Sequence, residues 1–283
     1  MLLQRPVQKV GKVRLYTPDG RAAEPNAAET ALQLLEHGKS PRDAELISSR
    51  KSRIYRQAAD GGRVYVKHYR SRRRKERIKR LIRSPHRNIT LWRRLAALQI
   101  PAPTPLLLAR KRREAVLVIE EMPKPTLREH IGRGEPVTPA LMAAFGGTWG
   151  RLHNSRMIHY DPSPGNITLP EGEQDMAGLL DLDSVYVVPA VPAFVARHRL
   201  QRFFYKLTTE CLRRQGTAPD GAAFQAFWHG YAEATGVDTT RHAQTVIQRM
   251  EARIGSRRKK RQGETFLAAA RDWRAALEPD QSD

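Results

Sequence analysis

The stretch His159-Tyr160-Asp161-Pro162-Ser163-Pro164-Gly165-Asn166 decides the fold assignment of this chain. Asp161 is followed five residues later by Asn166, and a short apolar run further on leads into Asp181. Phosphoryl transfer needs a carboxylate that accepts the proton of the attacking hydroxyl, and oxygen ligands that hold Mg²⁺ against the phosphates of ATP. The spacing predicts the first role for Asp161 and the second for Asn166 and Asp181.

A lysine that would contact the nucleotide lies upstream of this loop. Two strand-like runs between Ile54 and Tyr69 flank Asp60-Gly61-Gly62, which is typical of a β-hairpin. The second run alternates apolar and polar residues and places Lys67 in mid-strand, where it could reach the α- and β-phosphates. A strand lysine taken alone is more often a surface residue. Its occurrence upstream of Asp161, Asn166 and Asp181 favours the functional interpretation.

The remaining hydrophobic pattern predicts strands first and helices later. Residues 13–16 and 115–119 are expected to be strands, and a helix capped by Asn26 should end at Gly38. Further helices are expected before Pro101, from 141 to 152, and near 193–213, 221–235 and 240–254. A strand pair is expected around Ile167 and Leu180. Asp183 should point the same way as Asp181 if residues 180–183 form a regular strand.

This order predicts an α+β chain with a two-lobed protein-kinase-like fold, in which a strand-rich N-lobe precedes a helical C-lobe. We expect residues 1–44 to be an N-terminal extension that packs on the N-lobe. The N-lobe should span residues 45–122, and the helical C-lobe with its basic C-terminal tail should span residues 123–283. A length of 283 residues is sufficient for two lobes with their own cores.

The charge of the chain is strongly positive. Fifty Lys and Arg against 29 Asp and Glu give a net charge of +21, and the sequence pI is about 10.8. Such a charge favours an anionic partner. Cys211 is the only cysteine, so the chain forms no internal disulfide. The N-terminal residues contain no apolar stretch long enough for a signal peptide, and no window approaches the ~20 apolar residues that span a bilayer. We therefore expect a protein that is soluble in the cytoplasm or held on a membrane from outside it.

The motifs best resemble those of the lipopolysaccharide core kinases, which phosphorylate Kdo or heptose. The resemblance runs from about Arg53 to Tyr231. It rests on residues 65–70, 98–103, 118–121, 159–166, 180–183 and 199–202. It implies ATP and Mg²⁺ as cofactors, with adenine bound to backbone groups around Glu120 and Met122.

The chain departs from the superfamily pattern at two nucleotide-binding positions. Asn88 stands where a helix glutamate usually pairs with the strand lysine, and Glu76 is an alternative partner. The phosphate-covering loop, residues 48–52, has no glycine, so Ser49 and Lys51 would contact the phosphates by hydroxyl, backbone and charge. No Asp-Phe-Gly or Ala-Pro-Glu motif follows Asp181. A small or glycolipid acceptor therefore fits better than a protein acceptor.

The partner expected from these features is an anionic glycolipid or a phosphorylated sugar. The basic cluster at 70–83 would contact anionic headgroups or the phosphates of lipid A and hold the enzyme on an acidic membrane surface, at the cytoplasmic face of the inner membrane. The alternative is that this cluster only keeps the chain soluble. A second basic cluster lies at 257–261. A helix carrying Phe266 and Trp273 would either dock on that membrane or pack on the C-lobe. The sequence does not define the oligomeric state.

Three alternatives to a core kinase remain open. Asn88 and the glycine-free loop are compatible with a pseudokinase that acts as a membrane adaptor. The acceptor could also be another small molecule or a protein. Net charge alone would allow a nucleic-acid-binding protein, but the basic runs contain no recognition motif or interleaved aromatic residues, so we do not expect nucleic acid as the partner.

Overall fold

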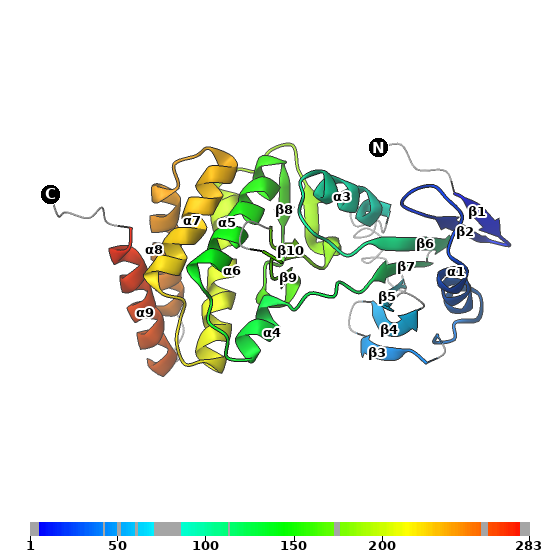
Figure 1. Ribbon diagram of the computed structural model, residues 1–283, viewed down its shortest axis with the longest axis horizontal. Helices are drawn as coiled ribbons and strands as arrows, with labels where there is room; N and C mark the ends of the chain where they lie inside the picture. The colour runs from blue at the N-terminus through cyan, green and yellow to red at the C-terminus, as the bar shows by residue number, and fades with distance from the viewer. Residues whose placement is uncertain are drawn as a thin grey trace. The chain divides into compact units, whose positions relative to one another are not determined.

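The computed structural model describes residues 6–41, 43–49, 52–59, 62–70, 86–112, 114–172, 176–255 and 260–277. The chain forms two compact units, drawn in Figure 1. The first comprises residues 1–96 and 102–123, and the second comprises residues 97–101 and 124–283.

Within the described residues, the first unit is built on a seven-stranded antiparallel sheet in the order β1-β2-β6-β7-β5-β4-β3. The strands are β1 (Gln8–Val10), β2 (Val13–Tyr16), β3 (Glu45–Ser48), β4 (Arg53–Ala59), β5 (Gly62–Tyr69), β6 (Pro105–Lys111) and β7 (Glu114–Glu120). The strands predicted at 13–16 and 115–119, and the hairpin between Ile54 and Tyr69, are confirmed. Because β2 pairs with β6, strands β1 and β2, which precede residue 45, belong to the same sheet as the predicted N-lobe.

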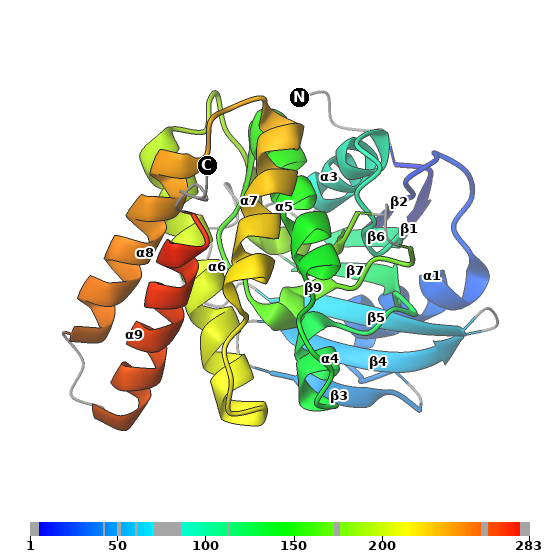
Figure 2. The ribbon, with the colours of Figure 1, turned by 60° about the vertical axis from the view of Figure 1, so that its left-hand side comes forward.

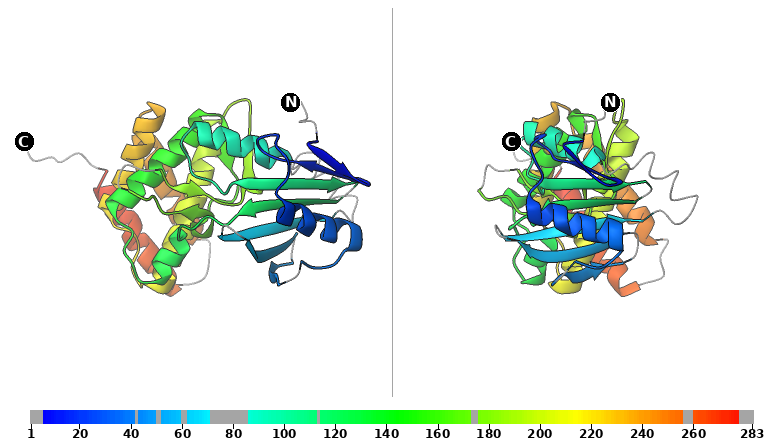
Figure 3. Two further views of the ribbon diagram at one scale, coloured as in Figure 1. Left: turned by 45° about the vertical axis from the view of Figure 1, so that its right-hand side comes forward. Right: turned by 90° about the vertical axis from the view of Figure 1, so that its right-hand side faces the viewer.

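One face of this sheet is covered by α1 (Pro25–Leu32) and its continuation, the π-helix η1 (Gln33–His37), as the left view of Figure 3 shows. Apolar residues of these helices pack on alternate residues of β5, β6 and β7. The predicted cap was wrong: the Glu24 carboxylate accepts from the backbone N–H groups of Asn26 and Ala27, because Pro25 occupies the first helical position. Gly38 ends the π-helix as predicted, in a left-handed conformation with φ 66°.

The opposite face of the sheet packs against α3 (His86–Ala97), the helix predicted before Pro101. Ile89 of α3 is buried with Leu108 and Leu117 of the sheet. Leu117 is paired directly with Lys67, so Lys67 lies on the α3 side of β5.

The described part of the second unit is mainly helical. Its helices are α4 (Leu127–Gly132), α5 (Pro139–Asn154), α6 (Ala193–Arg214), α7 (Gly221–Thr235), α8 (Thr240–Gly255) and α9 (Lys260–Ala275). Helices α5 and α7 lie side by side in Figure 2 and approach closely through glycines. The helices predicted near 193–213, 221–235 and 240–254 are confirmed. None of the helices in the described residues is long and apolar enough to cross a bilayer.

Helix α9 packs on the helical unit, which is one of the two roles predicted for it. Trp273 stacks on Phe224 with 4.6 Å between ring centres, and Phe266 stacks on Tyr205 at 5.6 Å. Trp273 and Phe266 are both buried. The apolar face of α9 is therefore used within the protein.

Two short strand pairs carry the predicted functional loops. β8 (Met157–His159) pairs with β11 (Val185–Val187), and β9 (Ile167–Thr168) pairs with β10 (Gly178–Leu179). The regular strand predicted for residues 180–183 was wrong. Asp181 adopts a left-handed conformation, and Leu182–Ser184 form a 3₁₀ turn, η3. The expectation that Asp183 points the same way as Asp181 therefore has no basis.

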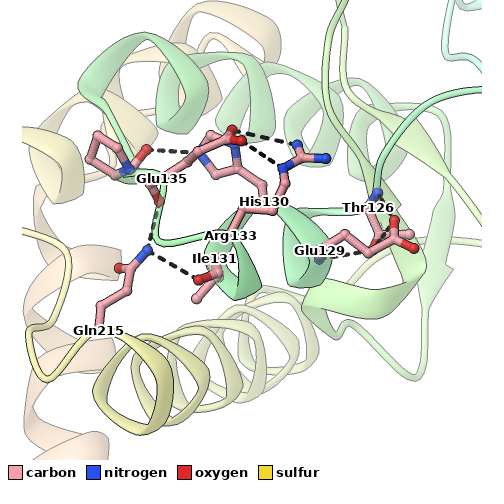
Figure 4. Close-up of polar contacts among 8 residues, drawn as sticks. Thr126, Glu129, His130, Ile131, Arg133, Glu135 and Gln215 are labelled. Carbon is pink, nitrogen blue, oxygen red and sulfur yellow. Dashed lines mark hydrogen bonds and ion pairs between the residues drawn. The ribbon is translucent and has the colours of Figure 1, made fainter.

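Helix α4 is fixed by the polar contacts in Figure 4. The Thr126 hydroxyl accepts from the Glu129 N–H, and the Glu129 carboxylate accepts from the Thr126 N–H at 2.7 Å, which is a capping box. At its other end, Gln215 donates to the carbonyls of Glu135 (2.6 Å) and Ile131 (3.4 Å). These contacts join α4 to the C-terminal end of α6.

Candidate active site

The His159–Asn166 loop is organised around a neutral histidine. The Asp161 backbone N–H donates to Nδ1 of His159 at 3.2 Å. Since Nδ1 accepts, the ring proton lies on Nε2, which donates to the Leu180 carbonyl at 3.1 Å. Burial lowers the pKa of His159, which favours this neutral form. His159 thus acts as scaffold: it joins the Asp161 loop to the segment that leads into Asp181.

Asn166 is held beside Asp161. Its side-chain Nδ2 donates to the Asp161 carbonyl at 2.9 Å, and its backbone N–H donates to the Ser163 carbonyl at 2.8 Å. The 3₁₀ turn η2 (Pro164–Asn166) closes the loop between these contacts. Because the nitrogen of the amide is engaged by the loop, the amide oxygen is the atom of Asn166 that a cation would take.

Asp181 follows the residue that pairs with Asn166. The Leu180 N–H donates to the Asn166 carbonyl at 2.8 Å and extends the β9–β10 pairing by one step. Asp181 then turns out of the strand with φ 53° and ψ 60°. Its Oδ2 accepts from the Ser184 hydroxyl at 2.9 Å. The structure therefore brings Asp161, Asn166 and Asp181 together at the ends of two short strand pairs.

Helix α6 supplies cations to Asp161. Nζ of Lys206 lies 2.5 Å from Oδ1 of Asp161, and Nη2 of Arg202 lies 4.0 Å from the same oxygen. Burial raises the pKa of Asp161, but the hydrogen bond and charge of Lys206, together with His159 and Arg202, outweigh burial and hold that pKa below its usual value. Asp161 is therefore ionised at neutral pH.

Lys67 and Asn88 both belong to the first unit. Lys67 is half-buried in β5, and Asn88 is 3% exposed on α3, next to Ile89. Both residues lie on the α3 side of the sheet, the arrangement expected if Asn88 occupies the position of a helix glutamate. Glu76, the alternative partner of Lys67, lies outside the described residues.

The other predicted nucleotide contacts within the described residues lie at or just beyond the ends of strands: Ser49 follows β3, Glu120 ends β7, and Met122 follows β7. Ser49 is exposed after β3, while Lys51 lies outside the described residues. The N–H of Glu120 donates to the Thr104 carbonyl (2.9 Å), and the N–H of Glu121 donates to Arg63 (2.8 Å). These two N–H groups are therefore engaged within the sheet and are not available to adenine.

The oxygen donors of the loop suit Mg²⁺. This ion prefers carboxylate and amide oxygens and commonly completes its shell with water and substrate phosphates. Asn166 and Asp181 provide such oxygens. No group of three or more His, Cys, Asp or Glu residues in the described part of the chain is arranged to hold a metal. One Asp and one Asn would supply two oxygen ligands, and water or substrate phosphates would have to supply the others.

The α6 cations at this site were not predicted from the sequence. Arg199 and Arg202 belong to a stretch that resembles the core kinases, and Lys206 lies outside that stretch. A signal was present, because residues 199, 202 and 206 are spaced to share one helix face. The spacing does not identify which segment that face contacts.

Together, the units make this an α+β protein with the two-lobed kinase-like fold that the sequence predicted: a strand-rich unit carrying Lys67, then a helical unit carrying the Asp161, Asn166 and Asp181 loops.

Among known proteins, the chain is similar only at low sequence identity to the solved structures described next. No protein-family model and no curated protein matches the chain. It is similar to a solved structure of WbdD with the kinase inhibitor LY294002, at 15% identity and a TM-score of 0.47, covering 71% of this chain and 49% of that chain. A second WbdD structure matches at 14% identity and a TM-score of 0.47, covering 75% and 50%.

A third solved structure, described as the bifunctional kinase-methyltransferase WbdD, matches at 15% identity and a TM-score of 0.45, covering 70% of this chain and 47% of that chain. The chain thus spans about half the length of these structures. At such values, its function has to be argued from its own residues.

Proposed function

We propose that the chain is an ATP-dependent kinase of the lipopolysaccharide core kinase family, which phosphorylates a hydroxyl of Kdo or heptose in the inner core. The observation that carries the proposal is the linked loop geometry. The Asn166 amide bonds the Asp161 carbonyl, and the Asn166 carbonyl bonds the residue before Asp181. These bonds hold Asp161, Asn166 and Asp181 near one another, which supports their proposed roles as base and metal ligands.

In this proposal each loop residue has a defined role. Asp161, ionised at neutral pH, accepts the proton of the acceptor hydroxyl at its carboxylate. Asn166 and Asp181 hold Mg²⁺, and Lys67 orients the α- and β-phosphates of ATP, with Ser49, Lys51, Asn88, Glu120 and Met122 completing the nucleotide site. Bound Mg·ATP supplies the phosphoryl group and neutralises charge during its transfer. His159 keeps the Asp161 backbone fixed.

The proposed location is the cytoplasmic face of the inner membrane, where the chain would bind peripherally. Its net charge of +21 supports attraction to an acidic lipid surface. The basic cluster at 70–83 lies outside the described residues except for Arg70, and residues 256–259 of the second cluster also lie outside them.

Replacing either loop carboxylate tests the mechanism. We expect Asp161→Asn to lower kcat by about 10²–10⁴-fold, the usual contribution of a general base. Asp181→Asn should lower transfer at least as far and weaken Mg²⁺-dependent ATP binding. Transfer of γ-³²P to core lipopolysaccharide, together with the thermal shift caused by Mg·ATP, measures both effects.

Glu233→Gln is the matched control, because it makes the same chemical change at a carboxylate whose side chain is 69% exposed. Full turnover by Asp161→Asn or Asp181→Asn would refute the mechanism. If the unmodified protein binds Mg·ATP but transfers no phosphate, the pseudokinase alternative is correct. If it hydrolyses ATP while the core phosphate content does not depend on it, the acceptor is a different molecule.

A further inference from the structure

One face of α6 presents three cations to the loop that contains Asp161. Arg199, Arg202 and Lys206 are separated by three and four residues, so they lie along one face of the helix. The Arg199 guanidinium lies 4.0 Å from the centre of the Tyr160 ring and donates to the Tyr160 carbonyl at 3.3 Å. Arg202 and Lys206 lie 4.0 Å and 2.5 Å from Oδ1 of Asp161. We call these three residues the α6 basic face.

The α6 basic face carries more charge than its partner neutralises. In the described part of the chain, its ion pairs are with Asp161 alone. Like charges one turn apart on a helix repel each other, and a half-exposed ion pair adds little stability. The contacts with Tyr160 account for the position of Arg199. One carboxylate does not neutralise three cations, however, whereas an anion bound beside them would compensate the surplus charge.

The face is open to a ligand. The exposed fractions of the Arg202 and Lys206 side chains are 38% and 31%, and that of Asp161 is 49%. Arg128 of α4 also packs over this loop: its Cζ lies 3.0 Å from where a Cβ on Gly165 would be. The planar fork of arginine binds phosphate and carboxylate with two parallel hydrogen bonds.

We propose that the α6 basic face binds an anionic group, a phosphate or a carboxylate, on the acceptor molecule. This rests on the proposed function and narrows its substrate class, because a neutral sugar would leave the surplus charge uncompensated. Arg199 and Arg202 contact the anion, which lies close to the hydroxyl that Asp161 deprotonates. Lys206 is a positioning residue that fixes Oδ1 of Asp161.

Binding of inorganic phosphate tests the proposal. The protein is first saturated with Mg²⁺ and a non-hydrolysable ATP analogue in 0.15 M NaCl, so that phosphate cannot occupy the nucleotide site. Calorimetric titration should then show that Arg202→Gln weakens phosphate binding by at least about tenfold, the effect of losing a charge-assisted hydrogen bond. Arg202→Lys should recover part of it.

Arg213→Gln is the matched control, because it removes the same charge from α6 at a side chain that is 55% exposed and pairs with Glu210. It should leave phosphate binding within about twofold of the unmodified protein, as expected for an exposed pair. Equal thermal midpoints of the variants exclude misfolding as the cause.

Three results would overturn the proposal: no phosphate binding by the unmodified protein, unchanged binding in Arg202→Gln, or equal losses in Arg202→Gln and Arg213→Gln. If Arg202→Gln weakens binding of the ATP analogue and not of phosphate, the anion at the α6 basic face is a phosphate of the nucleotide, and the proposal is also wrong. Failure of the kinase function is seen separately, as absence of analogue binding to the unmodified protein or unimpaired transfer by Asp161→Asn.

Discussion

His153 is a buried imidazole whose pKa links the stability of the second unit to pH. It lies on α5, with Nδ1 2.9 Å from the Tyr231 hydroxyl and Trp149 nearby. Burial lowers its pKa from 6.5 to about 4. Between these values the unfolded chain binds a proton that the folded protein does not, so stability falls as pH decreases. Between neutral pH and pH 4 this proton uptake lowers the free energy of unfolding by about 3 kcal/mol.

We therefore expect the double variant His153→Phe/Tyr231→Phe to lose less of its thermal midpoint between pH 7.5 and 5.0 than the unmodified protein. Replacing both partners avoids leaving a buried hydroxyl unpaired. His229→Gln is the control, because it removes an imidazole whose side chain is 73% exposed. Parallel pH profiles of the double variant and the unmodified protein would show that His153 does not contribute.

Individual contacts also differ in how far they could be predicted from the sequence. Asp161 and Asn166 are five residues apart, and the hydrogen bond between them is a property of a local loop. The contact of Lys206 with Asp161 spans 45 residues. It depends on which face of α6 packs toward the loop, and this is set by burial of Phe203 and Phe204 in the helical core rather than by nearby residues.

Helices α5 and α7 depend on glycine for their close contact. A Cβ on Gly146 would overlap the Phe227 carbonyl, whereas one on Gly147 would lie 3.1 Å from the flexible end of Met176. We expect Gly146→Ala to destabilise the protein by about 3 kcal/mol or more, because backbone atoms cannot move aside cheaply. Gly147→Ala should cost less. Urea denaturation measures both.

Gly132→Ala is the control for helix propensity. A Cβ at Gly132, the last residue of α4, meets nothing within 4 Å. Alanine there should be neutral or stabilising by up to about 1 kcal/mol. A Gly146→Ala variant as stable as Gly132→Ala would mean that the two helices do not approach as closely as described.

At the scale of elements, periodicity predicted the long helices and the β4–β5 hairpin because one apolar face repeats over several turns or residues. Periodicity did not predict the turn that follows β10. Residues 180–183 alternate apolar and acidic residues like a strand, yet the strand pairing stops at Leu180, and the Ser184 N–H closes η3 by donating to the Asp181 carbonyl. A local turn thus overrides an alternation that covers only four residues.

Net charge governs the behaviour of the whole molecule. A charge of +21 should bind the chain to vesicles that contain phosphatidylglycerol, since each basic residue near such a surface contributes ~1 kcal/mol. Co-sedimentation should fall steeply between 0.05 M and 0.5 M NaCl, where the screening length shortens to a few ångströms. Neutral phosphatidylcholine vesicles are the control. Salt-resistant binding to both vesicle types would indicate an apolar contact instead.

Asp181 has two roles in the proposed mechanism: its backbone adopts the left-handed conformation of the turn, and its side chain supplies a ligand oxygen. Asn and Asp adopt this conformation more readily than other residues that carry a Cβ, while alanine strains it. An inactive alanine substitution would therefore be ambiguous, because it distorts the turn as well as deleting the ligand oxygen. Asparagine preserves the turn and removes only the charge, and glycine relaxes the turn and removes the whole side chain. Comparing Asp181→Asn with Asp181→Gly therefore distinguishes the loss of the charged ligand oxygen from a change in the backbone of the turn.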